Sequence, residues 1–141
     1  MSDRSDVRFD EIGAIYATFK GDGSTITYDS TKVGGSSQVG LAATFSADNT
    51  VALTADGNAV VGKVSQVYSD GFVRVQIGGY MTLPAGDSAT VTRGKAIVGD
   101  LGASSAKGYI RDVDTATAAE LGVAVGQIYN VGDTANVGVM I

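Results

Sequence analysis

The stretch Phe72-Val-Arg-Val-Gln-Ile-Gly-Gly-Tyr-Met-Thr-Leu83 carries the strongest signal for the fold class of this chain. Its apolar residues share one parity: Val73, Val75, Ile77, Met81 and Leu83. The other parity is polar: Arg74, Gln76, Tyr80 and Thr82. Alternation with a period of two predicts a half-buried antiparallel strand, and Gly78-Gly79 predicts a bulge or sharp bend in its middle.

Two hairpins extend this pattern. Residues 59–68 lead through Ser69-Asp70-Gly71 into the strand just described, with a glycine where the turn needs a positive φ. Residues 123–131 and 135–141 form a second predicted hairpin through Gly132-Asp133. The N-terminal side is less regular: Ile12, Ile15, Tyr16 and Phe19 have helical spacing, but the run Tyr-Ala-Thr-Phe favours a strand or an extended arm.

Further short strands are expected between turn signals. They are residues 26–28, 39–45, 51–53, 89–92, 95–98 and 108–113. One or two helical turns are expected at residues 115–121, with Asp114 as the cap and Gly122 as the stop. The sequence therefore predicts one all-β domain over residues 1–141. We expect a jelly-roll or barrel-like β-sandwich of short antiparallel strands, with an extended N-terminal arm at residues 1–10.

The composition restricts the chemistry. The 141 residues contain no Cys, His or Trp, which removes Cys–His and Ser–His–Asp catalysis and the common zinc, copper and iron ligand sets. A carboxylate-only or Ser–Lys mechanism stays conceivable, but we expect no enzyme, no cofactor and no metal. Ten basic against fifteen acidic residues do not suit a nucleic-acid binder. No apolar h-region and no membrane-spanning run is present.

Several residue groups were weighed as sites. Asp100, Asp112 and Asp114 offer oxygen ligands for Ca²⁺, but loop carboxylates and a helix cap explain them more simply. Gly21–Gly23 and Gly34–Ser37 are interpreted as turns rather than phosphate cradles, and Ser65 near Lys63 as surface polar residues. The tyrosines suggest either a sugar-binding face or strand and interface residues, with Tyr80 on the polar face of its strand.

The run from Val51 to the C-terminus resembles the capsid decoration (cement) proteins of tailed bacteriophages. Three blocks carry the likeness: residues 51–86, which end in Tyr-Met-Thr-Leu-Pro-Ala-Gly; Arg93-Gly-Lys-Ala-Ile-Val-Gly-Asp-Leu-Gly102; and residues 121–141, which end in Gly-Asp-Thr-Ala-Asn-Val-Gly-Val-Met-Ile. The likeness covers about two-thirds of the chain, and residues 1–50 lie outside it.

The resemblance implies a structural virion protein that binds the outer surface of an icosahedral capsid and bridges its subunits. Its partners would be the major capsid protein and further copies of itself, as a homodimer by preference or as a trimer. It would be made in the bacterial host cytoplasm, with no nucleic-acid or membrane partner. Arg4, Arg8 and Phe9 of the arm, together with Tyr80, are the expected interface residues. The alternative is a glycan- or receptor-binding β module on a virion or cell surface.

Overall fold

The computed structural model describes residues 13–141, and strands dominate them. The strands are β1 Ile15–Gly21, β2 Ala42–Ala47, β3 Thr50–Leu53, β4 Gly62–Val67, β5 Phe72–Gly78, β6 Tyr80–Leu83, β7 Ile97–Asp100, β8 Tyr109–Asp112, β9 Gln127–Asn130 and β10 Val137–Met140. The helical turns are η1 Val33–Gly35, η2 Ala103–Ser105 and α1 Ala118–Leu121. The predicted all-β class is confirmed, as is its barrel-like character.

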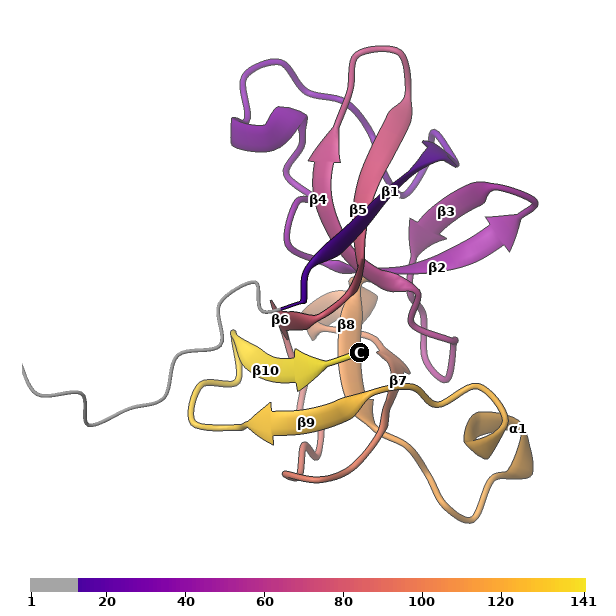
Figure 1. Ribbon diagram of the computed structural model, residues 1–141, viewed down its shortest axis with the longest axis vertical. Helices are drawn as coiled ribbons and strands as arrows, with labels where there is room; N and C mark the ends of the chain where they lie inside the picture. Colours follow the sequence, from indigo (N-terminus) through magenta and orange to yellow (C-terminus); the bar gives the residue numbers. More distant parts are fainter. Residues whose placement is uncertain (1–12) are drawn as a thin grey trace, which may run out of the picture.

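The first five strands form a closed barrel in the order β1-β3-β2-β4-β5, which β5 completes by pairing with β1 (Figure 1). The strand pairs are antiparallel except β1–β3, which is parallel. In that pair, Lys20 lies opposite Thr50 and Gly21 opposite Val51. We call residues 13–78 the barrel lobe. Its core consists of Ile26, Ala43, Val51, Leu53, Val64, Val67, Val73 and Val75.

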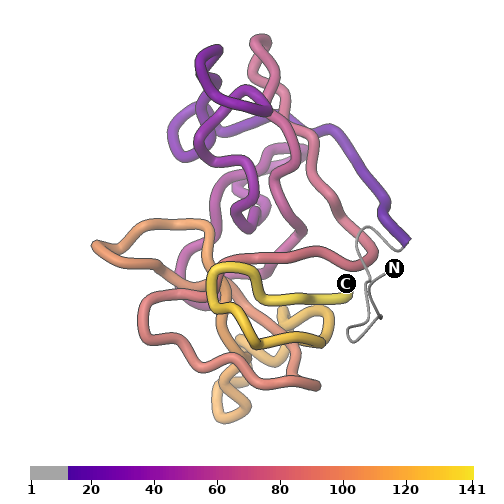
Figure 2. Tube along the Cα trace, turned by 90° about the vertical axis from the view of Figure 1, so that its left-hand side faces the viewer, coloured from indigo at the N-terminus to yellow at the C-terminus, as the bar shows by residue number. Residues whose placement is uncertain are grey.

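Residues 79–141 form the C-terminal lobe, built from two smaller sheets, β6-β10-β9 and β7-β8. Backbone hydrogen bonds join these sheets on both sides: Ile97 exchanges two bonds with Val125, and Ile110 donates to the carbonyl of Pro84. The strands therefore surround a second core, in which Leu83, Ile97, Ile110, Ile128 and Val137 are fully enclosed. In Figure 2 the barrel lobe lies above the C-terminal lobe.

The bend at Gly78-Gly79 passes the chain from one lobe to the other, as its glycines predicted. Gly79 has φ +87°, a left-handed conformation that favours glycine, and its N–H and C=O both bond to Ile141. The alternation continues across the bend, since Val73, Val75, Met81 and Leu83 are buried. Two polar-parity residues, Gln76 and Tyr80, are also buried, and Ile77 of the apolar parity is only half-buried. The Gln76 amide donates to the carbonyls of Gly78 and Tyr80.

Two predicted strands do not form. Residues 26–28 are a loop because the Asp22 carboxylate accepts the backbone N–H groups of Ser24, Thr25 and Ile26, which competes with strand pairing. Residues 89–92 also lie outside the strands, although Thr90 accepts a bond from Asp112. The expected strand at residues 95–98 begins later, at Ile97. Both predicted hairpins, β4–β5 and β9–β10, are confirmed.

Candidate functional site

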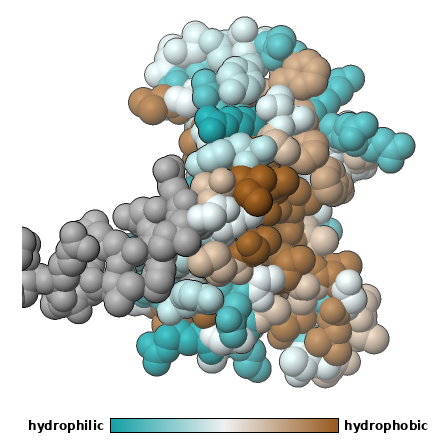
Figure 3. Space-filling model, viewed as in Figure 1, coloured by the Kyte–Doolittle hydropathy of each residue, from teal (hydrophilic) through white to brown (hydrophobic). Residues whose placement is uncertain are grey.

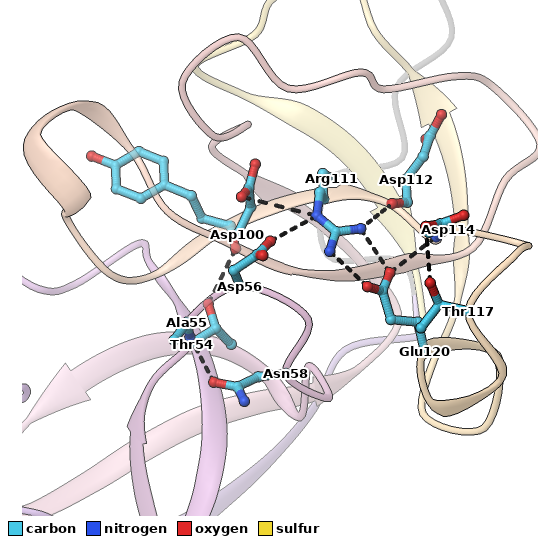
Figure 4. Close-up of polar contacts among 11 residues, drawn as sticks. Thr54, Ala55, Asp56, Asn58, Asp100, Arg111, Asp112, Asp114, Thr117 and Glu120 are labelled. Atoms are coloured by element: carbon cyan, nitrogen blue, oxygen red, sulfur yellow. Dashed lines mark hydrogen bonds and ion pairs between the residues drawn. The ribbon is translucent and has the colours of Figure 1, made fainter.

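A polar network surrounds Arg111 of β8, at the junction of the two lobes (Figure 4). Its guanidinium makes a two-pronged contact with Glu120 of α1, at 2.7 and 2.9 Å, and its Nε donates to Asp56 at 2.9 Å. A further N–H donates to the carbonyl of Asp112 at 3.0 Å, and Asp100 Oδ1 lies 4.0 Å from Nε. The planar guanidinium fork matches a carboxylate in this geometry.

The electrostatics of the network hold Arg111 and Glu120 in their charged forms. Hydrogen bonds from Arg111 lower the pKa of Glu120 to about 2, and the same contact raises the pKa of Arg111. Burial raises the pKa of Asp100, and the nearby carboxylate of Asp56 adds to this effect. A guanidinium whose N–H groups are already bonded to carboxylates is poorly suited to binding another anion, so the network is a structural link.

That link joins segments far apart in the chain. Asp56 follows β3 in the barrel lobe, whereas Asp100, Arg111 and Glu120 belong to the C-terminal lobe. The sequence pattern points to Asp100 but not to Arg111, Asp56 or Glu120. A weak signal existed, because Glu120 is one of two glutamates in the chain. The pairing of Arg111 with Asp56 spans 55 residues, and no local pattern predicts a contact of that separation.

Asp100, Asp112 and Asp114, weighed above as a Ca²⁺ site, do line one open pocket of about 510 Å³ beside Arg111. Their oxygens serve the protein itself, however. Asp112 accepts the N–H of Thr92, and Asp114 accepts the N–H of Ala116 and the hydroxyl of Thr117. Within residues 13–141, no group of three or more carboxylates is placed to hold a metal ion.

The cap prediction for the helix is half right. Gly122 is the C-cap of α1, as expected. Asp114 is not its N-cap, because the helix begins at Ala118 and the N-cap position is Thr117. Asp114 instead stabilises the turn that precedes the helix, through its bonds to Ala116 and Thr117.

The two glycine-rich segments lie in loops and turns. In the first, the carboxylate of Asp22 occupies the N–H groups that a phosphate would need. In the second, Gly35 packs directly on β4. Ser65 and Lys63 do not form a catalytic pair, because Lys63 Nζ donates to Thr82 Oγ1 at 3.1 Å.

The tyrosines do not form one aromatic platform. Tyr16 lies under the Arg74 guanidinium, at 3.9 Å from ring centroid to Cζ, while Tyr80 and Tyr129 meet edge to face at 6.4 Å in the other lobe. Tyr28 and Tyr68 line a separate pocket on the barrel lobe.

The prediction that Tyr80 lies on the exposed polar face of its strand is wrong. Its side chain is 8% exposed and covers Gly138 of β10, where the absence of a Cβ leaves room for the phenol. The role of Tyr80 in a partner interface stays a prediction. The other expected interface residues, Arg4, Arg8 and Phe9, lie outside the described residues.

Large apolar side chains also lie on the surface, and they form the second candidate site. Figure 3 shows hydrophobic residues gathered along the middle and right of one face, over the region where Figure 1 places β2, the C-terminus and α1. Exposed apolar side chains on these elements are Phe45 of β2 (52%), Leu121 of α1 (51%) and, just after α1, Val123 (36%). We call these three residues the apolar face.

Phe45 is held in place by an aromatic contact. Its ring meets that of Phe19 edge to face, with centroids 5.2 Å apart, and Phe19 in turn packs against the core of the barrel lobe. The exposed ring therefore projects from a rigid strand pair rather than from a mobile loop, which suits a preorganised contact.

No family model, curated protein or solved structure matches this chain. No helix in residues 13–141 is long and apolar enough to cross a membrane.

Proposed function

We propose that this protein is a structural virion protein that binds the outer surface of an icosahedral phage capsid and stabilises it by bridging capsid subunits. The observation that carries the proposal is the apolar face, which offers a rigid, exposed aromatic ring together with aliphatic side chains on a β scaffold. Exposed large apolar side chains that gather on one face are typical of protein interaction sites. The resemblance of residues 51–141 to capsid decoration proteins supplies the kind of partner.

The composition supports the same function. Without His or Cys, the chain lacks the side chains on which most enzymes rely for proton transfer and nucleophilic attack near neutral pH. Contact with other proteins requires neither. Each copy would contact several capsid subunits and a second copy of itself, so that many weak contacts must break together before subunits separate. The jelly-roll form and the N-terminal arm belong to this proposal as expectations.

Co-sedimentation with capsids tests the function. Heads assembled from the major capsid protein of a tailed phage that encodes this chain would be mixed with purified protein and pelleted. We expect the protein to pellet with the heads at saturable stoichiometry and to raise the temperature at which they rupture. Protein that stays in the supernatant at every concentration would contradict the proposal.

A substitution on the apolar face tests where the contact lies. Fully burying a Phe side chain contributes roughly 1.5–3 kcal/mol, and Phe45 is about half exposed, so Phe45→Ser should weaken binding to heads about three- to tenfold. Val33→Ser is the matched control, because Val33 is 96% exposed but lies on η1, away from β2. An equal loss of binding in both variants would show that the apolar face is not the surface that contacts the capsid.

Size-exclusion chromatography with light scattering tests self-association. We expect a homodimer, with a trimer as the alternative stoichiometry. A protein that remains monomeric both in solution and on the heads would remove self-association from the proposal without affecting capsid binding.

A further inference from the structure

A pocket of about 320 Å³ lies at the end of the barrel lobe that carries η1, well apart from the Arg111 network. Its polar and aromatic lining consists of Tyr28, Ser30, Lys32, Gln66, Tyr68 and Ser69. Both views place the loop around η1 beside the end of the β4–β5 hairpin (Figures 1 and 2). The volume is at the lower end of the range of small-molecule sites, roughly 300–1,000 Å³.

The pocket is built in advance of any ligand. Its loop is closed by backbone bonds from Asp29 to the carbonyl of Gly35 (2.7 Å) and from Gly35 to that of Lys32 (3.1 Å). The same loop is pressed onto β4, because a Cβ on Gly35 would fall on the carbonyl oxygen of Val67. A binding loop fixed in this way loses little conformational entropy when a ligand arrives.

The polar side chains that line this pocket are not engaged in hydrogen bonds within residues 13–141. The side chains of Tyr28, Lys32, Gln66 and Tyr68 make no hydrogen bond or ion pair with any residue of the described chain. The pocket beside Arg111 differs in this respect, since its Arg111, Asp112 and Asp114 are engaged with the protein. Nearby, the Asp29 carboxylate is bonded to Thr31 and does not line the pocket, and it also interacts electrostatically with Lys32.

This combination fits a sugar. The aromatic rings of Tyr28 and Tyr68 offer apolar faces for the C–H side of a pyranose, and Tyr28 is 46% exposed. A pyranose also carries hydroxyl groups that need partners, which Gln66, Ser30, Ser69 and the two phenols can supply. Lys32 is the charged side chain of the lining, so a carboxylate on the sugar would gain a charge-assisted bond.

We propose that the pocket between η1 and the β4–β5 hairpin binds a saccharide unit, and that Lys32 gives it a preference for an acidic sugar over its neutral counterpart. The site lies apart from the apolar face and does not depend on capsid binding. A virion or capsid-bound protein with such a site would recognise glycans with its exposed barrel end.

Two matched probes test the site: methyl β-D-glucoside and methyl β-D-glucuronide, which differ by a carboxylate in place of a hydroxymethyl group, together with the corresponding pair of galactosides. They would be titrated into the ¹⁵N-labelled full chain. We expect shifts of the amide signals of residues 28–35 and 66–69, with dissociation constants on the order of 1 mM for ligands of this size. The uronides should bind several-fold more tightly.

Variants assign the contacts. Tyr28→Ala should weaken binding of all probes about tenfold, whereas Tyr129→Ala, which removes a comparably exposed ring (41%) in the other lobe, should leave it unchanged. Lys32→Gln should remove the preference for uronides and leave the neutral sugars unaffected. Tyr28→Phe removes only the hydroxyl and keeps the ring that packs on Gly35. It therefore distinguishes the loss of a sugar contact from a change in the fold of the loop.

Three results would overturn the proposal. They are the absence of any shift with all four glycosides at roughly 50 mM, about fifty times the expected constant, shifts that persist undiminished in a folded Tyr28→Ala variant, and shifts confined to residues outside the pocket. Equal affinity for acidic and neutral sugars would overturn the role of Lys32. Phe45→Ser should bind sugar normally, which separates failure of this site from failure of the capsid proposal.

Discussion

At the scale of single residues, Gln76 connects the two lobes. It is 6% exposed, and its side-chain N–H₂ donates to the carbonyl of Gly78 at 3.1 Å and to that of Tyr80 at 3.0 Å, on both sides of the bend. Polar side chains are buried at little cost when they are hydrogen-bonded in this way. The Gln76 amide therefore fixes the angle at which β5 passes into β6.

We expect Gln76→Leu to lower the free energy of unfolding by about 2 kcal/mol, because the leucine keeps the volume but removes both hydrogen bonds. Urea titration followed by circular dichroism would measure the change. Gln66→Leu is the control, since the Gln66 side chain is half-buried and makes no such bonds. Similar stabilities for the two variants would mean that the amide does not brace the bend.

Glu120 makes stability depend on pH. Its folded-state pKa, about 2, lies below the ordinary value of 4.5, so the folded chain binds this proton less tightly than the unfolded chain does. The stabilisation is therefore complete above pH 4.5 and is lost as the pH falls toward 2. Asp100 opposes this trend in part, because its pKa is raised in the folded chain.

The measurement is the melting temperature (Tm) of wild type and Glu120→Gln as a function of pH. At neutral pH we expect Tm to be several degrees lower for the variant, and the difference should close as the pH falls from about 4.5 to 2. As a surface control, Asp48→Asn in the exposed turn between β2 and β3 should leave Tm at neutral pH unchanged. A difference that stays constant with pH would show that the Arg111 ion pair does not contribute through its charge.

At the scale of elements, η1 depends on its glycines, of which Gly35 is the more tightly packed. Gly35 has φ +87°, and a Cβ there would collide with the backbone of β4 at Val67. Gly23 has a similar φ, +74°, but faces open space. A side chain at Gly23 or at Gly35 would therefore meet the same backbone strain, but only the one at Gly35 would also clash with a neighbouring strand.

We expect Gly23→Ala to cost about 1 kcal/mol, the strain of a left-handed alanine, and Gly35→Ala to cost at least about 2 kcal/mol more through the clash. Thermal unfolding of both variants measures the difference. Gly35→Ala should also open the pocket and weaken sugar binding. Equal losses of stability would mean that the loop yields easily and that its packing on β4 is not tight.

At the scale of the whole molecule, two cores are joined into one folding unit. Ala42 and Ala43, neighbours on β2, contribute one to each core. Backbone bonds also cross the junction, from Ala42 to Gly108 at 2.8 Å and from Gly108 to Thr54 at 2.8 Å. The lobes should therefore unfold together.

Leu83→Ala, in the core of the C-terminal lobe, should lower the free energy of unfolding by about 2–5 kcal/mol and still give a single transition. Circular dichroism and tyrosine fluorescence would be compared along the same urea titration, since coincident curves indicate two-state unfolding. Leu121→Ala, at a site 51% exposed, should change stability by less than about 0.5 kcal/mol. Two separated transitions in Leu83→Ala would show that the lobes fold independently.

Local patterns in the sequence determined the all-β class, both hairpins, the bend at Gly78-Gly79 and the burial of Val73, Val75, Met81 and Leu83. These features depend on side-chain alternation and turn residues, which act between near neighbours in the chain. The same reasoning failed at residues 26–28, because the Asp22 carboxylate competes with a strand through hydrogen bonds that propensity does not register.

The tertiary structure alone decided the rest: the parallel closure of the barrel by β1 and β3, the division of the core in two, the network around Arg111, the burial of Tyr80 and the pocket between Tyr28 and Tyr68. Each of these brings together residues separated by tens of positions. Their contacts depend on how the strands are arranged in space, and the period-two alternation of one strand is the same whichever partner it pairs with.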